Sequence, residues 1–252
     1  MAKEQSVRPR IIGLDVDTME WTPLGPPGLF SKLLSRDLET GARTALQRMD
    51  PGLGYVAPSV AHYHMTYEEI LGIEGYFSFD QRTWVVPRSY VFHPPRTVHG
   101  FNSVVPQESL FLSRVGQDLA FNFVEEPEHD DLYVVDGEAP PRPPAAYGDP
   151  IASLGWAETE LLGQPTSTCL LSRDPSIGEG SALARLPKGW TSEARQREDY
   201  LEIFVLDGGL SADGEPAIAG RTYFFIPPRE PVPAFHAVKD VEIYVNFGRD
   251  FA

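Results

Sequence analysis

The stretch that decides the fold opens with HYHMTYEE at residues 62–69 and closes with PPRTVH at residues 94–99. These two ends together hold three of the six histidines of the chain. Side chains at positions i and i+2 of a β-strand point to the same face, so His62 and His64 project side by side if the segment is extended. Two imidazoles then share one pocket.

Two further residues can complete a metal-binding set around this pair. Glu68 follows after three residues, enough chain to turn a corner before the apolar run at residues 70–73. His99 comes after a Pro-Pro turn, which we expect at a strand entrance because proline cannot donate to a strand ladder. The residues therefore predict one mononuclear metal site with the ligands His62, His64, Glu68 and His99.

The predicted ligand set narrows the choice of metal only in part. Three neutral imidazoles and one carboxylate suit Fe²⁺, Mn²⁺, Ni²⁺, Zn²⁺ or Cu²⁺, and the ligand types do not separate these ions. An octahedral ion held by four protein atoms keeps two positions open for a substrate or dioxygen, whereas tetrahedral zinc with four ligands would be closed and structural.

Composition favours an all-β protein. The chain has 252 residues and is 42% hydrophobic, enough to bury a sizeable core in one large or two small domains. Its 24 prolines and 22 glycines indicate many turns and few long helices. Alternating or β-branched segments, such as residues 43–47 and 241–245, are separated by turn signals at short intervals.

The charge of the chain argues against two classes of partner. A net charge of −15 would repel nucleic-acid phosphates and an anionic membrane surface, so we expect neither as a partner. Cys169 is the single cysteine, which excludes an internal disulfide framework. The polar start of the sequence leads into no long apolar run, so we expect a cytoplasmic protein without a secretory signal or membrane span.

An internal repeat gives the domain count. LLSRD at residues 33–37 recurs letter for letter at residues 170–174, and YVFHPPR at 90–96 pairs with YFFIPPR at 223–229. The offset drifts from 137 to 133, as expected if insertions and deletions fall in loops. We therefore predict an N-terminal domain over residues 1–125, an acidic, proline-rich linker over 126–149, and a C-terminal domain over 150–252.

The second copy of the repeat has lost the metal ligands. In place of His62 and His64 it has Arg195 and Arg197 or, with the register moved by one residue, Gln196 and Glu198; in place of His99 it has Val232. Glu202 survives and His236 lies a few residues past the turn, but these two residues alone do not make a site. We expect the C-terminal domain to serve as structure or interface, and to contribute at most to closing the pocket.

The motifs of the first copy resemble those of a known family. The pattern His-x-His-x3-Glu-x6-Gly, read as His62, His64, Glu68 and Gly75, and the segment from Pro94 to His99 are similar to the two motifs of the cupin superfamily. The sequence looks most like the cupin domain of zinc-binding anti-sigma factors and related single- and double-cupin dioxygenases. It departs from the pattern at Arg88 and Arg96, where glycines are usual. The asparagine that the second motif normally carries is also displaced, and Asn102 is the nearest candidate for it.

The resemblance implies two tandem cupin barrels, that is, double-stranded β-helices or jelly rolls, with one divalent metal in the N-terminal barrel. It implies a metal-dependent enzyme acting on a small organic molecule, with an Fe²⁺ dioxygenase as the first expectation. A metal-dependent isomerase, cyclase or lyase and a non-catalytic zinc-binding sensor stay open. Cupins often pair through edge strands, so a homodimer is also open.

Three residues beside the predicted ligands are candidates for catalysis. Tyr63 lies between the two histidines, Asn102 follows His99, and Arg114 lies on an apolar strand. A buried arginine beside the ion would indicate an anionic substrate, because guanidinium binds carboxylates with two parallel hydrogen bonds. An Arg114 side chain that points to solvent is the equal alternative. His93 is expected to be exposed or to lie behind the ligands, and Glu69 is expected to face outward.

Overall fold

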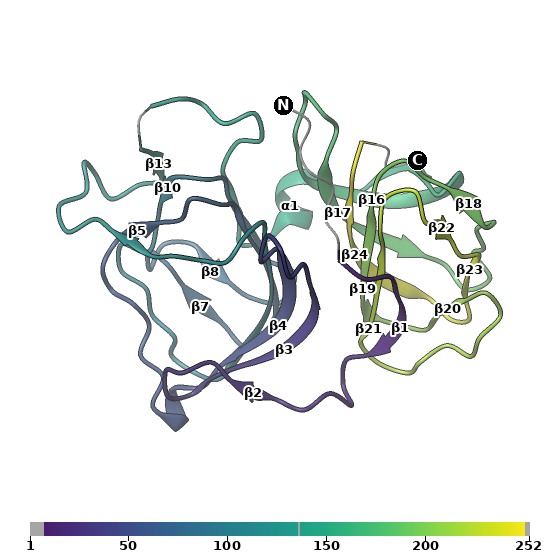
Figure 1. Ribbon diagram of the computed structural model, residues 1–252, viewed down its shortest axis with the longest axis horizontal. Helices are drawn as coiled ribbons and strands as arrows, with labels where there is room; N and C mark the ends of the chain where they lie inside the picture. Colours follow the sequence, from purple (N-terminus) through teal and green to yellow (C-terminus); the bar gives the residue numbers. More distant parts are fainter. Residues whose placement is uncertain (1–7, 136, 250–252) are drawn as a thin grey trace. The chain divides into compact units, whose positions relative to one another are not determined.

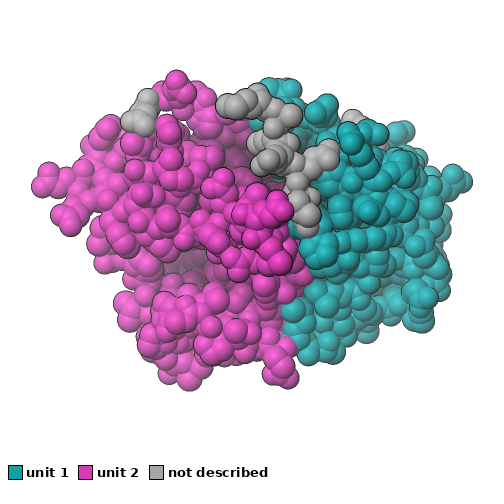
Figure 2. Space-filling view, viewed as in Figure 1, with its two compact units in different colours: residues 1–19, 154–252 teal, residues 20–153 magenta. Residues whose placement is uncertain are grey.

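A computed structural model describes residues 8–135 and 137–249 of the chain. Within these residues the fold is almost entirely β, as the sequence predicts, with one short α-helix, α1 (Pro150–Leu154), and one 3₁₀ turn, η1 (Pro51–Leu53) (Figure 1). The chain divides into two compact units (Figure 2). Unit 2 is residues 20–153, and unit 1 combines residues 154–252 with the start of the chain up to residue 19. None of the helices in the described part of the chain is long and apolar enough to span a membrane.

Unit 2 is built on a seven-stranded antiparallel sheet. Its strand order is β14 (Ala145–Tyr147), β9 (Tyr90–His93), β6 (Glu68–Glu74), β11 (Ser109–Val115), β4 (Arg43–Met49), β3 (Leu29–Arg36) and β2 (Thr22–Pro23). Three two-stranded ribbons complete it: β5 (His62–Tyr63) with β12 (Asn122–Phe123), β10 (Thr97–Val98) with β13 (Tyr133–Val134), and β7 (Phe77–Ser78) with β8 (Trp84–Val85).

Unit 1 repeats this plan with a second seven-stranded antiparallel sheet. Its order is β1 (Ile11–Asp15), β21 (Thr222–Ile226), β19 (Leu201–Asp207), β24 (Val241–Phe247), β17 (Gly180–Leu186), β16 (Gln164–Arg173) and β15 (Ala157–Leu161). Its ribbons are β18 (Arg195–Gln196) with β22 (Pro231–Val232), and β20 (Leu210–Ala212) with β23 (Phe235–Ala237).

Tight turns end the strands that carry the motif residues. Gly75 follows β6 with φ +71°, and a Cβ at this position would lie 2.2 Å from the backbone oxygen of Glu108, so only glycine fits. Arg88 and Arg96, which replace the usual glycines of the family motif, have φ values of +70° and +66°. The two turns therefore keep the left-handed conformation that glycine would supply, at the cost of some backbone strain.

The units divide the chain differently from the expected domains. The start of the chain supplies β1, which pairs with β21 of unit 1, and residues 145–147 of the expected linker form β14, which pairs with β9 of unit 2. Residues 126–149 are thus in part an edge strand and not a free connector. The sequence pattern of a linker misleads here because its prolines and acids surround an arginine, Arg142, that is buried.

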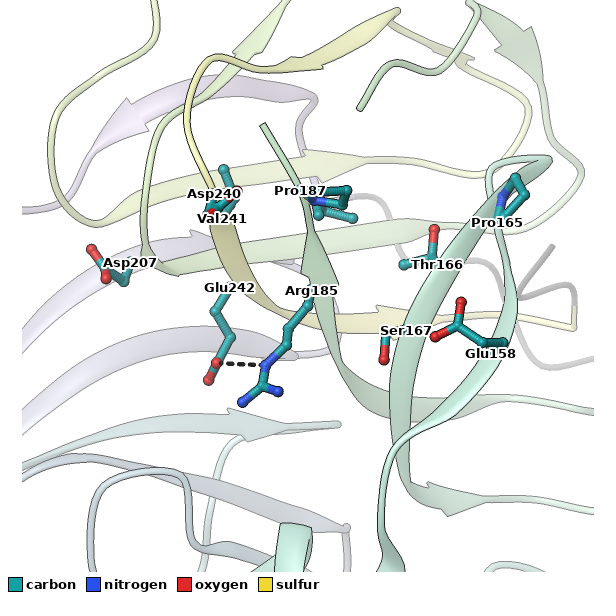
Figure 3. A pocket seen from close by; sticks show the side chains of 11 residues that line it. Glu158, Pro165, Thr166, Ser167, Arg185, Pro187, Asp207, Asp240, Val241 and Glu242 are labelled. Atoms are coloured by element: carbon teal, nitrogen blue, oxygen red, sulfur yellow. Dashed lines mark ion pairs between the residues drawn. The ribbon is translucent and has the colours of Figure 1, made fainter. Parts of the chain in front are cut away.

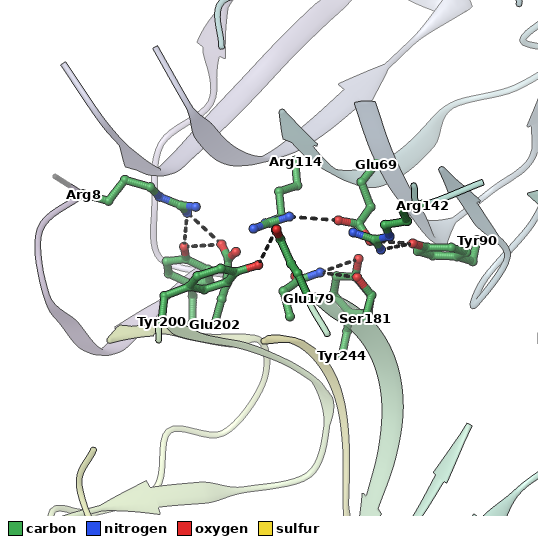
Figure 4. A network of polar contacts seen from close by, with 12 residues as sticks. Arg8, Glu69, Tyr90, Arg114, Arg142, Glu179, Ser181, Tyr200, Glu202 and Tyr244 are labelled. Carbon is green, nitrogen blue, oxygen red and sulfur yellow. Dashed lines mark hydrogen bonds and ion pairs between the residues drawn. The ribbon is translucent and has the colours of Figure 1, made fainter. Parts of the chain in front are cut away.

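Each edge strand is anchored by a buried set of one arginine, one glutamate and one tyrosine (Figure 4). In unit 2, Arg142 donates to the Glu69 carboxylate at 2.8 Å and to the Tyr90 hydroxyl at 2.8 Å, and Tyr90 donates to Glu69 at 2.5 Å. In unit 1, Arg8 donates to Glu202 and to Tyr223, each at 2.7 Å, and Tyr223 donates to Glu202 at 2.6 Å. The repeat therefore includes the Arg-Pro pairs at residues 8–9 and 142–143.

Candidate metal centre

Three short strands of unit 2 and the residues that follow them bring the histidines together. His62 lies on β5 and His64 follows two residues later; His93 ends β9, and His99 follows β10. The backbone N–H of each of His62 and His99 donates to the backbone oxygen of the other at 2.9 Å, which joins the two motifs directly. The four imidazoles are all buried.

Glu68 reaches the histidines from the first position of β6. It lies directly opposite His93 on β9 and Val115 on β11, and Val115 lies opposite Arg43 on β4. Residues that face each other across neighbouring strands point to the same side of a sheet. Glu68 and His93 therefore share one face, and Glu69 and Arg114 share the other.

The side chains form two overlapping groups that could hold a metal ion. His62, His64 and His99 make one group, and Glu68, His93 and His99 make the other. Within each group the candidate ligand atoms lie within 4.8 Å of one another. The structure thus brings the four predicted ligands into one neighbourhood, adds His93 to them, and makes His99 the member that both groups share.

Backbone carbonyls fix the orientation of three imidazoles. Nδ1 of His62 lies 3.1 Å from the Val60 oxygen, Nδ1 of His64 lies 2.8 Å from the Ala120 oxygen, and Nδ1 of His99 lies 2.9 Å from the Thr97 oxygen. A carbonyl oxygen only accepts, so each Nδ1 carries the proton and each Nε2 keeps its lone pair. This is the usual second interaction of a metal-binding histidine.

The electrostatics of the cluster favour the protonation states that a cation needs. Burial lowers the pKa of His62 and of His93 to about 4, and it lowers the pKa of His64 as well. Burial would raise the pKa of Glu68, but its contacts with His93 and His99 outweigh that effect and hold the pKa well below its usual range. Near neutral pH these three imidazoles are neutral and the carboxylate is ionised.

Two buried nitrogens support the fit of a metal ion. Among the described residues, Nδ1 of His93 and Nε2 of His99 have no hydrogen-bond partner. Nε2 of His99 lies 3.3 Å from Oε2 of Glu68, and Nδ1 of His93 lies 3.7 Å from the same oxygen. Buried polar atoms without partners are costly, and a divalent cation would satisfy both nitrogens and the carboxylate together. The donor set suits such an ion.

Aromatic side chains that the sequence does not single out surround the cluster. The ring centroid of Phe121 lies 4.7 Å from that of His62 and 5.0 Å from that of His64. The ring centroid of Phe79 lies 5.8 Å from that of His93 and 6.0 Å from that of His99. The apolar cluster of unit 2 continues behind Phe79, through Phe77, Val85, Val91 and Phe111. No local motif marks these residues, because their role depends on strand pairing.

The three candidate catalytic residues do not converge on the cluster. Arg114 contacts Glu69 at 3.1 Å on the opposite face of the sheet from Glu68, so it is buried but does not stand beside the ligands. Asn102 is exposed. Tyr63 lies between His62 and His64 and therefore points to the other face of β5.

Two further expectations are corrected. Glu69 does not face solvent but is buried at 1% exposure, because Arg114, Arg142 and Tyr90 neutralise and solvate its carboxylate. His93 is not exposed but buried at 3%, because it ends a strand that is buried along its whole length.

Unit 1 has an arginine and apolar side chains where unit 2 has ligands. Arg195 pairs with Val232 as His62 pairs with His99, and Leu201 pairs with Ile226 as Glu68 pairs with His93. Leu201, Ile226 and Val232 belong to one apolar cluster. Glu202 faces Phe225 as Glu69 faces Phe92, so the surviving carboxylate corresponds to Glu69 and not to Glu68.

A pocket of about 570 Å³ lies elsewhere, in unit 1 (Figure 3). Carboxylates dominate its polar lining, and Arg185 pairs with Glu242 at 3.5 Å inside it. None of its lining residues belongs to the two metal-binding groups.

Comparisons with known proteins agree with this geometry. Residues 10–117 match the family described as ChrR Cupin-like domain. No curated protein sequence matches the chain. A solved structure of a candidate dioxygenase from Nostoc punctiforme is similar, with a TM-score of 0.75 and 18% identity, over 94% of this chain and 82% of that one.

Two other solved structures are similar at lower scores. A salicylate 1,2-dioxygenase variant from Pseudoaminobacter salicylatoxidans, in complex with gentisate, has a TM-score of 0.57 and 13% identity, over 92% of this chain and 77% of that one. AerE from Microcystis aeruginosa has a TM-score of 0.55 and 11% identity, over 92% of this chain and 97% of that one. These likenesses concern the fold. The family match covers the residues that carry the histidine motifs, and it identifies residues 10–117 as a cupin-like domain.

Proposed function

We propose that the protein is a metal-dependent cupin oxygenase that acts on a small organic molecule. The observation that carries the proposal is the convergence of His62, His64, His99 and Glu68 in unit 2, with each Nδ1 of the three imidazoles held by a carbonyl. The likeness to structures described as dioxygenases supports the choice of reaction class. Iron(II) is the metal that we expect.

The proposal assigns different roles to the two halves of the chain. We take each unit as one jelly-roll barrel, with the metal centre in unit 2 and a structural role for unit 1. The apolar side chains at the ligand positions of unit 1 support this division, because Leu201, Ile226 and Val232 offer no ligand atoms.

The residues of unit 2 prepare the site for a cation. The three carbonyl contacts keep the lone pairs of the imidazoles available, and Glu68 supplies one negative charge that offsets part of the charge of a divalent ion. Phe79 and Phe121 pack against the imidazoles and limit access of water. A bound ion would supply open coordination positions and redox or Lewis-acid chemistry.

The test begins with protein purified under anaerobic conditions. Elemental analysis gives the metal content, and an oxygen electrode then records oxygen uptake with a panel of diketones and catechols. We expect about one iron per chain and uptake that depends on a member of the panel. The His62→Ala variant should lose both, whereas His236→Ala, on an exposed residue of unit 1, should keep both.

A zinc-binding sensor is the second candidate, and the match to the ChrR Cupin-like domain family favours it. The same experiment separates the two functions. Stoichiometric zinc with no oxygen uptake across the panel would support sensing and would contradict the oxygenase. A reaction that proceeds without oxygen uptake would instead indicate an isomerase, cyclase or lyase that uses the ion as a Lewis acid.

A further inference from the structure

His93 stands apart from the other three histidines of the cluster. No motif of the sequence selects it, yet it lies opposite Glu68 on the neighbouring strand and is buried at 3% exposure. Its ring stacks on that of His99, with centroids 4.1 Å apart and an interplanar angle of 26°. The ring centroid of Phe79 lies 5.8 Å from that of His93.

The nitrogen of His93 that faces the cluster has no hydrogen bond. Nδ1 lies 3.7 Å from Oε2 of Glu68, too far for a hydrogen bond, and no described residue supplies another partner for it. The other three imidazoles use Nδ1 to donate to a carbonyl, whereas His93 turns Nδ1 toward the carboxylate. A buried nitrogen without a partner that points at a carboxylate and an imidazole is in the position of an additional ligand.

The shared member, His99, limits the cluster to one ion. Its Nδ1 is committed to the Thr97 oxygen at 2.9 Å, so only Nε2 remains for a metal. One lone pair binds one ion, and the two groups that meet at His99 therefore cannot each hold an ion through it. An ion bound to Nε2 of His99 can therefore draw its other ligands from both groups.

We propose that His93 is a direct ligand of this ion, through Nδ1, so that one metal is held by four imidazoles and the Glu68 carboxylate. This inference rests on the proposed metal centre and extends it. Five protein atoms around an octahedral ion leave one open position in place of two. A substrate would then bind the ion through a single atom, unless one protein ligand moves aside.

The test counts imidazole ligands in the full-length protein loaded with Co²⁺ alone. Proton NMR of the paramagnetic protein shows each bound imidazole as a strongly shifted N–H signal that disappears in D₂O. We expect four such signals in the wild type, three in His93→Gln, and four in the control His129→Gln, which changes an exposed histidine. One Co²⁺ per chain should bind in each case.

The outcomes separate this inference from the metal centre itself. Three signals in the wild type, with one Co²⁺ bound, would overturn the role of His93 and leave the centre intact. Four signals that persist in His93→Gln would overturn it too. A wild type that binds no Co²⁺ would overturn both proposals. The wild-type count needs no variant, so the test holds even if His93→Gln does not fold.

Discussion

At the scale of single residues, burial of neutral histidines makes the metal-free protein sensitive to acid. His62 and His93 lie in surroundings that lower the pKa of each to about 4, from the ordinary histidine value of 6.5. The unfolded chain therefore binds protons between pH 6.5 and 4 that the folded protein does not accept. Since the unfolded state binds more protons in this window, the free energy of unfolding falls as the pH falls.

We predict that the metal-free protein is less stable at pH 5 than at pH 7, by up to about 2 kcal/mol for each of these histidines. Glu68 adds little in this window because its pKa is held well below the usual range and it stays ionised at both values. Urea unfolding at the two pH values measures the difference. His129→Gln should leave it unchanged and His62→Gln should reduce it; equal stability of the wild type at both pH values would contradict the prediction.

A second prediction concerns Glu69, the neighbour of Glu68. Its buried carboxylate faces two guanidinium groups, Arg142 at 2.8 Å and Arg114 at 3.1 Å. Glu69→Gln removes the negative charge and leaves two buried cations, which should lower the free energy of unfolding by about 3–5 kcal/mol. Urea unfolding measures the loss. The control Glu39→Gln changes an exposed carboxylate and should cost little, and a small loss in both variants would mean that the ion pairs of Glu69 contribute little to stability.

The sequence predicts some of these residues and not others for a physical reason. His62 and His64 are evident because the alternation of a strand places them on one face, and this needs no knowledge of the partner strand. His93 and Glu69 depend on which strands pair and in which register. A single sequence does not give that register, so it does not predict that both side chains are buried.

At the scale of elements, the β5–β12 ribbon supplies both ligands and their cover. Asn122 pairs with Tyr63 and Phe123 with His62, which sets Phe121 and Phe123 beside the imidazoles. Phe121 contacts both His62 and His64. Of these two histidines Phe123 contacts His62, with ring centroids 6.1 Å apart. The ribbon therefore controls how easily water and chelators reach the two histidines.

We predict that Phe121→Ala releases bound metal faster than the wild type does, by about tenfold, because the apolar cover of a metal site controls solvent access. The rate of Co²⁺ loss to excess EDTA, followed by absorbance, measures the effect. Phe123→Ala is the matched control and should have a smaller effect. Equal rates in the wild type and Phe121→Ala would show that the chelator reaches the ion by another side.

The edge strands β1 and β14 show where sequence patterns fail at this scale. Both strands are short, and both follow an Arg-Pro pair in a stretch that looks like a tail or a linker. What fixes each one is a buried arginine bound to a distant glutamate and tyrosine, a contact that composition does not reveal. The repeat of long, apolar strands was predictable, and the assignment of these edges to units was not.

The matching edge anchors give a further prediction. Arg8→Ala removes the guanidinium that lies 2.7 Å from the buried Glu202 carboxylate, so the free energy of unfolding should fall by about 3 kcal/mol. Urea unfolding tests this. Arg10→Ala serves as control, because Arg10 makes an exposed contact with the backbone oxygen of Pro231. A similar small loss in both variants would mean that β1 holds to unit 1 without its arginine.

At the scale of the whole molecule, one strand plan is used twice with different interiors. In unit 2 the inner positions carry imidazoles and a carboxylate, which need an ion to satisfy them. In unit 1 the positions that match Glu68, His93 and His99 carry Leu201, Ile226 and Val232, which bury apolar surface and need no ion, and Arg195 takes the place of His62. The stability of unit 2 should therefore depend on metal, and that of unit 1 should not.

Hydrogen exchange tests this difference in one experiment. A ligand that binds only the folded state stabilises it by an amount that grows with its concentration, and the protection appears where opening would release the ligand. We predict that saturating the metal-free protein with Co²⁺ slows amide exchange in β6, β9 and β11, which carry or adjoin the ligands. The matching strands β19, β21 and β24 should exchange at the same rate with and without the ion. Mass spectrometry of peptic peptides reads both sets at once, so each set serves as the control for the other. Equal slowing of both sets would mean that the two units open together, and no slowing in either would mean that the ion does not bind at the histidine cluster.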